Sequence, residues 1–176
     1  MLTSPSASSP SIANLAAIVD YQPAHHAQVV ELILHIQNVE SKVGIALDDQ
    51  PDLRDIERHY IADGGGFWVA LDRQHRVVGT LGLQIKTAQI AVMKKFFVAA
   101  AWRGAGKGCA SQLFAALIAH ARLRGVATVV LDTPSVATRS HRFYIRQGFT
   151  QIASAELPVQ YDYPDRDSLL FRLDLA

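Results

Sequence analysis

The chain of 176 residues is poor in cysteine and has no residue pattern typical of a metal site. Its single cysteine, Cys109, excludes an internal disulfide and argues against a cysteine-based metal site. Because Cys109 follows a glycine run inside an apolar pattern, we interpret it as a small packing residue rather than a nucleophile. The seven histidines lack the spacing of metal ligands, so we expect no bound metal.

Long apolar runs and clustered basic residues are also missing. The longest obvious apolar run, Phe96 to Trp102, is far shorter than the roughly 18 residues of a membrane span. The first basic residue is Lys42, so the basic region of a secretory signal is absent. We therefore expect a cytoplasmic protein without a membrane partner. A balanced net charge of +1 without a basic run also argues against binding to nucleic acid.

Charge is unevenly distributed along the chain. From Glu31 to Asp72 there are nine acidic residues and only three basic ones. From Arg73 to Leu131 there are nine basic residues and no carboxylate. The second segment carries no negative charge that would repel an anion, so a polyanionic small molecule is a natural partner for it.

The spacing of apolar residues predicts an α/β (α+β) chain with one folded domain, residues 15–176, after a flexible leader, residues 1–14, which is rich in Ser, Pro and Ala. A short helix is predicted from a cap at Asp52, and Gly125 and Gly148 are predicted to end two later helices. The predicted order is strand 15–21, helix to about 40, helix 52–60, strands 67–71, 77–85 and 89–98, helix to 125, strand 126–131, helix from 135, and strand 169–173.

A glycine-rich segment, Arg103-Gly104-Ala105-Gly106-Lys107-Gly108, lies between a predicted strand and a predicted helix. Backbone N–H groups and the helix dipole at such a junction bind phosphate. The segment lacks the Walker pattern, which needs Gly at position 101 and Ser or Thr at position 108. It also lacks the dinucleotide fingerprint, which needs Gly in place of Cys109.

The segment does match the Arg/Gln-x-x-Gly-x-Gly/Ala signature, and in this respect it resembles the GNAT family of N-acetyltransferases. The preceding run, residues 93–98, resembles the central strand of that family, and residues 143–149 are similar to its Phe-Tyr-x-x-x-Gly-Phe motif. The resemblance covers nearly the whole chain. It implies a mixed, mostly antiparallel sheet of six to seven strands flanked by about four helices, and acetyl-CoA as co-substrate.

The resemblance also implies roles for individual residues. Backbone groups of Phe96 and Val98 would pair with the pantetheine arm, and Tyr144 would protonate the leaving CoA thiolate. The implied reaction is transfer of an acetyl group to a primary amine of a small molecule. The oligomeric state stays open, a homodimer included. The pyrophosphate would be held by Arg103, Gly104, Ala105, Gly106, Lys107 and Gly108.

The group that deprotonates the amine is less well defined. Many GNAT enzymes use a carboxylate on the central strands, but there is no Asp or Glu between Asp72 and Asp132, so we expect none on those strands. We also expect Lys94 and Lys95 to point to opposite faces of the sheet. The remaining candidates are ordered water, Glu40, Asp48, Asp49, Asp52, Tyr161 and Tyr163.

Two other functions stay open at this point. A protein N-terminal or lysine acetyltransferase would use the same chemistry with a more open acceptor groove. A non-catalytic CoA-sensing module would keep the glycine-rich loop and lose the acceptor chemistry.

Overall fold

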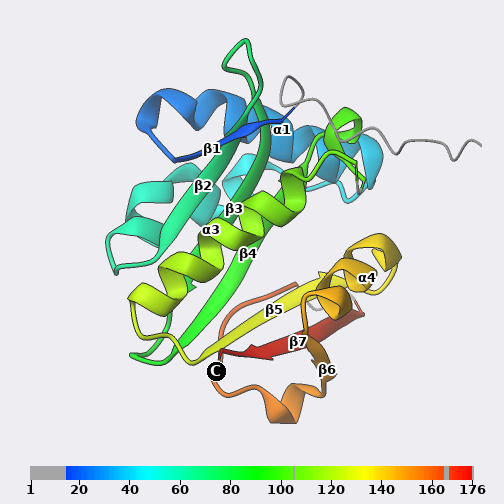
Figure 1. Ribbon diagram of the computed structural model, residues 1–176. Helices are drawn as coiled ribbons and strands as arrows, with labels where there is room; N and C mark the ends of the chain where they lie inside the picture. Colours follow the sequence, from blue (N-terminus) through cyan, green and yellow to red (C-terminus); the bar gives the residue numbers. More distant parts are fainter. Residues whose placement is uncertain (1–14, 105, 165–166, 176) are drawn as a thin grey trace, which may run out of the picture.

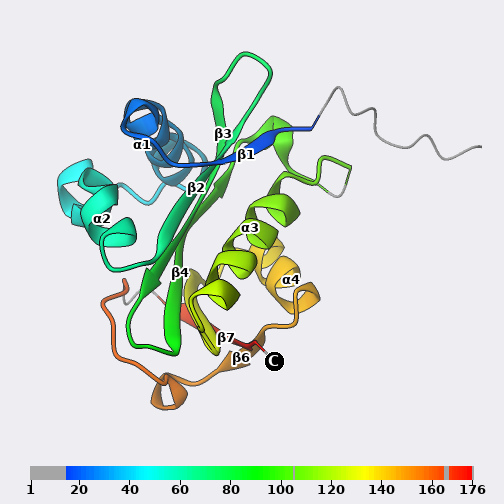
Figure 2. The ribbon, with the colours of Figure 1, turned by 60° about the vertical axis from the view of Figure 1, so that its left-hand side comes forward.

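The computed structural model describes residues 15–104, 106–164 and 167–175, so the predicted leader and Ala105 lie outside the described residues. One seven-stranded sheet forms the centre of the fold, with α1 and α2 on one face and α3 and α4 on the other (Figures 1 and 2). The predicted α/β domain with a mostly antiparallel sheet is confirmed.

The described elements follow the predicted order closely. Short π-helical turns extend the first helix (Ile36–Glu40) and follow the second one (Glu57–Ile61). The helices are α1 (His26–His35), α2 (Pro51–Arg54), α3 (Cys109–Leu123) and α4 (Thr138–Arg146). The strands are β1 (Ala17–Asp20), β2 (Gly66–Leu71), β3 (Val77–Ile85), β4 (Ile90–Val98), β5 (Thr128–Pro134), β6 (Thr150–Ile152) and β7 (Ser168–Asp174).

Three details differ from the sequence-based expectations. Asp52 lies inside the first turn of α2 and does not cap it, because the helix begins one residue earlier at a proline. Helix α4 begins at Thr138 rather than at Ser135. Strand β5 runs beyond Leu131 to Pro134 and therefore includes Asp132. Gly125 and Gly148 do have the left-handed φ values, +74° and +97°, that helix ends favour.

Each face of the sheet carries its own apolar core. On one face, Leu113 and Leu117 of α3 are fully buried and belong to the same cluster as Leu81 and Leu83 of β3. The second cluster joins α1, α2, the second π-helical turn and β2; its largest fully buried members are Tyr60, Phe67, Ile33, Leu53 and Ile56. Burial of each large apolar side chain contributes about 1.5–3 kcal/mol of transfer free energy. The two clusters therefore fix the helices against the sheet.

The sheet opens between β4 and β5. The strand order is β1-β2-β3-β4-β5-β7-β6, and β4 and β5 are its only parallel pair among the described strands. They pair only between Ile90–Val92 and residues 128–130, and they diverge beyond that point (Figure 1). The rest of β4, residues 93–98, therefore has a free edge on the side facing β5 and α4.

Strand β4 also contains a bulge at Lys95, which has a φ of +55°. Thr80 of β3 pairs with Phe97, whereas Gly82 pairs with Lys94, so β4 contributes one extra residue at this point. The Thr80 hydroxyl donates a 2.7 Å hydrogen bond to the Lys95 carbonyl and holds the bulge in place.

The bulge overturns the prediction that Lys94 and Lys95 point to opposite faces. That prediction assumed the regular alternation of a strand, which an extra residue interrupts. Lys94 contacts the Tyr161 ring and Lys95 contacts Asp52, both on the face opposite α3. Two cations consequently lie side by side on one face at the point where the sheet opens.

Among the described residues, no helix is long and apolar enough to cross a membrane.

Candidate active site

The glycine-rich loop connects the end of β4 with α3. Gly104 and Gly108 have φ values of +104° and +67°, which glycine adopts without strain. A Cβ atom added to Gly104 or Gly106 would meet nothing within 4 Å, so the backbone of the loop is accessible from outside. The first N–H groups of the 15-residue helix α3 have no partner inside the helix and carry the positive end of its dipole. The loop can therefore receive a phosphate group.

Arg103 ties this loop to two other parts of the molecule. Its Nε–H donates a 2.8 Å hydrogen bond to the carbonyl of Val98, the last residue of β4. Its guanidinium lies 2.5 Å from the carboxylate of Glu40 at the end of the first π-helical turn. Glu40 is therefore paired with a cation, which makes it a weak candidate for the base. The Val98 carbonyl, expected to face the pantetheine arm, already accepts one bond.

A groove of about 730 Å³ lies between the loop and α4. Arg103 contributes to its wall together with Arg139 and Arg146 of α4, and none of the described residues that line it is a carboxylate. The sequence interpretation missed Arg139 and Arg146, although their spacing with Phe143, at four and seven residues, places all three on one helix face. The described residues that line the groove are Ala100, Arg103, Gly104, Ser111, Arg139, Phe143, Arg146 and Gln147.

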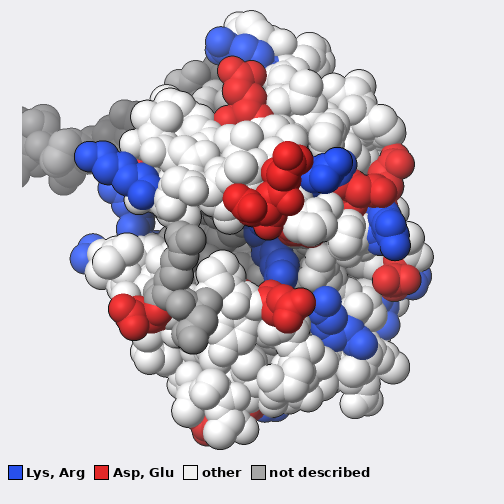
Figure 3. Space-filling model, turned by 180° about the vertical axis from the view of Figure 1, so that it is seen from behind, with Lys and Arg blue, Asp and Glu red and all other residues white. Residues whose placement is uncertain are grey.

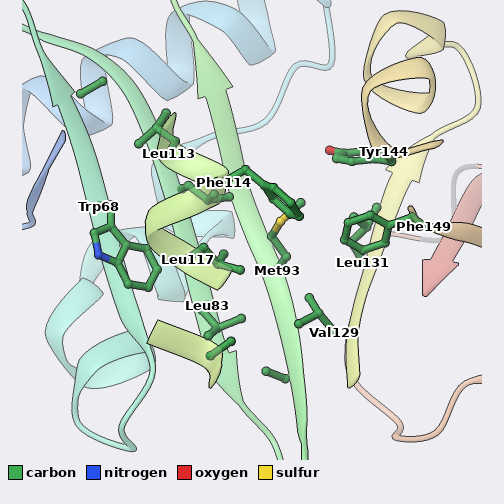
Figure 4. Close-up of a cluster of buried hydrophobic side chains, with 14 of the residues drawn as sticks. Trp68, Leu83, Met93, Leu113, Phe114, Leu117, Val129, Leu131, Tyr144 and Phe149 are labelled. Atoms are coloured by element: carbon green, nitrogen blue, oxygen red, sulfur yellow. The ribbon is translucent and has the colours of Figure 1, made fainter. Parts of the chain in front are cut away.

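Tyr144, on the buried side of α4, lies on the other side of the gap from β4. Its ring is 6% exposed and packs against Phe96, Phe149 and Phe171 at centroid distances of 6.3, 5.7 and 5.8 Å. The hydroxyl points across the gap towards β4 (Figure 4), and among the described residues it has no hydrogen-bond partner. Burial, followed by the charge of Asp132, raises the pKa of Tyr144, so the hydroxyl stays protonated at neutral pH.

The opposite face of the opening carries a network around Asp52. The Tyr60 hydroxyl donates a 2.5 Å hydrogen bond to Asp52, and the Lys95 ammonium lies 3.3 Å from the same oxygen. Lys95 also donates to Gln50, whose side chain exchanges hydrogen bonds with Gln37. Burial raises the pKa of Asp52, but Lys95 and the Tyr60 hydrogen bond outweigh it, and the net shift is downward. Figure 3 shows this face of the molecule. Basic side chains lie in a hollow there, and acidic side chains lie beside them.

Asp132, on β5, faces the same side as this network. Its Oδ1 accepts a 3.1 Å hydrogen bond from the Tyr161 hydroxyl. Burial raises the pKa of Asp132, and the nearby charge of Lys94 and the Tyr161 hydrogen bond only partly offset this effect. The expectation that the central strands carry no carboxylate is therefore wrong. It failed because the apolar pattern that defined β5 ends one residue before Asp132.

The other predicted base candidates lie in several different settings. Asp48 is exposed and forms a 3.6 Å ion pair with Arg54. Asp49 accepts a 3.1 Å hydrogen bond from the Ala46 N–H. Tyr161 is engaged with Asp132, and its ring lies 5.3 Å from that of Tyr163. Among the four carboxylates that were predicted as candidates, Asp52 is the one that lies near Asp132, since both act on the charge of Lys95.

The interpretation of Cys109 as a packing residue agrees with its surroundings. The side chain is 1% exposed, and burial raises the pKa of its thiol to about 11, so it is neutral and shielded. Within the described residues, no group of three or more His, Cys, Asp or Glu side chains could hold a metal ion.

Comparison with known proteins places this arrangement in a family. Residues 31–149 match the model of the Acetyltransferase (GNAT) family, and the chain belongs to that family. The membership of the GNAT family predicted from the sequence is thereby confirmed.

Solved structures and curated relatives agree with this assignment. An acetyltransferase from Streptococcus agalactiae has 40% identity and a TM-score of 0.86, covering 91% of this chain and 98% of that one. An N-acetylglutamate synthase from Neisseria gonorrhoeae, solved with coenzyme A and N-acetyl-glutamate, shares the fold with a TM-score of 0.69 at 17% identity, covering 92% of this chain and 35% of that one. N-acetyltransferase 8B of Rattus norvegicus is 33% identical over 102 residues, or 56% of this chain and 46% of its own. The chain thus spans about half the length of the curated relatives it matches.

Proposed function

We propose that the protein transfers the acetyl group of acetyl-CoA to a primary amine of a small molecule by direct attack, with Tyr144 as general acid. The observation that carries this proposal is the Tyr144 hydroxyl, which points without a partner among the described residues into the gap between β4 and β5. The phosphate-accepting loop adjoins the end of β4 at the same gap. Donor binding and proton donation are thus combined in one opening of the sheet.

The donor would lie along the free edge of β4. Residues 93–98 do not pair with β5, which leaves this edge of β4 open to an arm that hydrogen-bonds like a strand, with Phe96 and Val98 as its partners. Residues 103–108 would hold the pyrophosphate. The groove next to the loop adds Arg139 and Arg146, and the cationic character of its described residues suits the remaining phosphate of CoA.

The roles of the residues follow from their surroundings. The ring of Tyr144 is held by aromatic neighbours, which fixes the direction of the hydroxyl. Its raised pKa keeps the proton on the oxygen at neutral pH, so a proton is available when the C–S bond breaks. The leaving thiolate would take this proton from the Tyr144 hydroxyl.

The acceptor would approach from the other face, where Asp52, Lys94, Lys95 and Asp132 surround the opening. A hollow with charges of both signs suits a compact polar amine. A protein N-terminus or lysine is the second candidate, because the Rattus relative is named only as an N-acetyltransferase and leaves the acceptor open.

The test is release of free thiol from acetyl-CoA in the presence of polyamines, amino acids, aminoglycosides and short peptides. We expect turnover with at least one small amine and none without an acceptor. Preference for peptides would replace the small-molecule assignment with the protein substrate. Tight binding of acetyl-CoA without turnover on any panel would instead support a CoA sensor.

A further inference from the structure

Among the described residues, the carboxylates of Asp52 and Asp132 face the acceptor side of the opening, and their surroundings differ. Asp52 is engaged by the Tyr60 hydroxyl and by the Lys95 ammonium, so its charge is already compensated. Asp132 accepts a side-chain hydrogen bond from Tyr161, and no cation lies within 4 Å of it among the described residues. Of the two, Asp132 has the capacity to bind a further cationic group.

We propose that Asp132 binds the acceptor ammonium and receives its proton before the amine attacks. The inference rests on the proposed function and deepens it, because it assigns the base that the sequence left open. It also defines the acceptor class as an amine that is protonated in solution, such as an alkylamine.

The position of Asp132 fits this role. The last residue of β5 that pairs with β4 is Val130, so Asp132 lies two residues into the region where the strands diverge. Its neighbour Leu131 belongs to the core under α3, and the alternation of a strand turns Asp132 to the other face. The charge of Asp132 contributes to the raised pKa of Tyr144, so the two side chains are close enough to interact. They lie on opposite sides of the same opening in the sheet. Asp132 is only partly buried and can be reached by a ligand.

Its environment also suits proton transfer. Burial makes the carboxylate a stronger base than an exposed aspartate, whereas Lys94, the Tyr161 hydroxyl and Lys95 stabilise its ionised form and partly offset this effect. The other titratable groups that interact with it are Tyr144 of α4 and Tyr60 behind Asp52, both with raised pKa values and therefore neutral. His141 of α4 is directed to the Pro134 carbonyl instead.

The reaction is balanced as follows. An ammonium ion transfers one proton to the Asp132 carboxylate, and the carboxylic acid later returns this proton to water. The neutral nitrogen forms a bond to the acetyl carbon, the C–S bond breaks, and the sulfur takes the proton of the Tyr144 hydroxyl. The nitrogen then loses its second proton, which restores Tyr144. The products are the N-acetyl amine, free CoA thiol and one proton released to water.

The need for such a base is large for an alkylamine. With a pKa of about 10.4, such an amine is almost entirely protonated at pH 7, and an ammonium ion cannot attack the thioester. An arylamine, in contrast, is already neutral at pH 7 and needs no base before attack. The two kinds of acceptor therefore separate a role in deprotonation from a merely structural one.

The experiment compares the wild type with Asp132→Asn, which keeps the size of the side chain and an acceptor for Tyr161. We expect kcat/KM for the best alkylamine to fall by roughly 10²–10⁴-fold, with its dependence on pH below neutrality lost, and an aniline acceptor to react nearly as before. Affinity for acetyl-CoA, measured by calorimetry, should not change. Asp63→Asn, an exposed carboxylate in the turn before β2, is the matched control.

Each outcome decides the proposal. Unchanged kcat/KM for the alkylamine, or an equal loss for both acceptors, would overturn it and leave the proposed function standing. If wild type releases no thiol with any amine, the proposed function fails, and this inference fails with it. Should Asp132→Asn not fold, Tyr161→Phe gives the same decision. Loss of its hydrogen bond should shift the acidic limb of the pH profile upward, and an unshifted limb would count against Asp132 as the base.

Discussion

The Lys95 ammonium lies 3.3 Å from the Asp52 carboxylate across the interface between β4 and α2, and both side chains are about 15% exposed. The pair exists because the bulge at Lys95 turns this side chain towards α2. Such a pair holds α2 against the sheet only while both charges are present, since an unpaired charge at this depth is costly.

Asp52→Asn should therefore destabilise the fold. Removing one partner of a fully buried pair costs about 3–5 kcal/mol, and partial exposure reduces our expectation to about 1–3 kcal/mol. Urea unfolding at pH 7 measures this difference. The matched control is Asp48→Asn, since Asp48 pairs with Arg54 at 88% exposure of its side chain. The control should change the unfolding free energy by less than about 0.5 kcal/mol. Equal effects of both substitutions would contradict a stabilising role for the Lys95 pair.

The same carboxylate should make stability depend on pH. The pKa of Asp52 in the folded state is lowered, so its contribution is fully present above the pKa of an unfolded aspartate, about 3.9, and is lost as the pH falls through the lower folded value. Urea unfolding from pH 6 down to pH 3 should show a weaker decline for Asp52→Asn than for the wild type. Parallel curves for the two proteins would show that Asp52 does not contribute.

Regular elements of this fold could be predicted from the sequence, whereas irregular geometry could not. The helical stripe of α3 and the glycine after it define an element from local residues alone, and the structure agrees. The bulge at Lys95 has no signature in the neighbouring residues. Lysine rarely adopts a positive φ, and the hydrogen bond that holds the bulge comes from Thr80 on another strand. The position of Asp132 could not be predicted either. This residue follows the apolar run from which the strand was predicted, so it was placed outside β5.

Tyr144→Phe tests the proposed general acid. The substitution keeps the buried ring and its aromatic contacts, so the fold should be preserved. Without a proton for the leaving thiolate, kcat should fall by roughly 10- to 10⁴-fold, with little change in acetyl-CoA affinity. Thiol release gives kcat and calorimetry gives the affinity. Tyr21→Phe, a buried tyrosine of the other core, is the control. A kcat equal to that of wild type would exclude Tyr144 as the acid.

Gly106→Asp tests the proposed pyrophosphate site. A Cβ at this position meets nothing within 4 Å and the backbone has no positive φ, so the variant should fold. Its carboxylate would lie beside the bound pyrophosphate, and we expect acetyl-CoA to bind at least about tenfold more weakly, a change of about 1.4 kcal/mol. Gly106→Asn, equal in size but uncharged, separates charge from bulk. Equal affinities for Gly106→Asp and wild type would place the pyrophosphate elsewhere.

The arginines of α4 make a prediction about the far end of CoA. Arg139 and Arg146 line the groove beside the loop, whereas Arg142 on the same helix is exposed and does not line it. If the groove receives the 3′-phosphate, replacing both lining arginines by Gln should weaken acetyl-CoA binding roughly tenfold, within the range for charged hydrogen bonds. The same variant should bind 3′-dephospho-acetyl-CoA as wild type does, and raising the salt concentration should narrow the difference. Arg142→Gln should bind both ligands normally. Equal weakening for acetyl-CoA and its dephospho form would mean that the arginines support the helix and do not contact the phosphate.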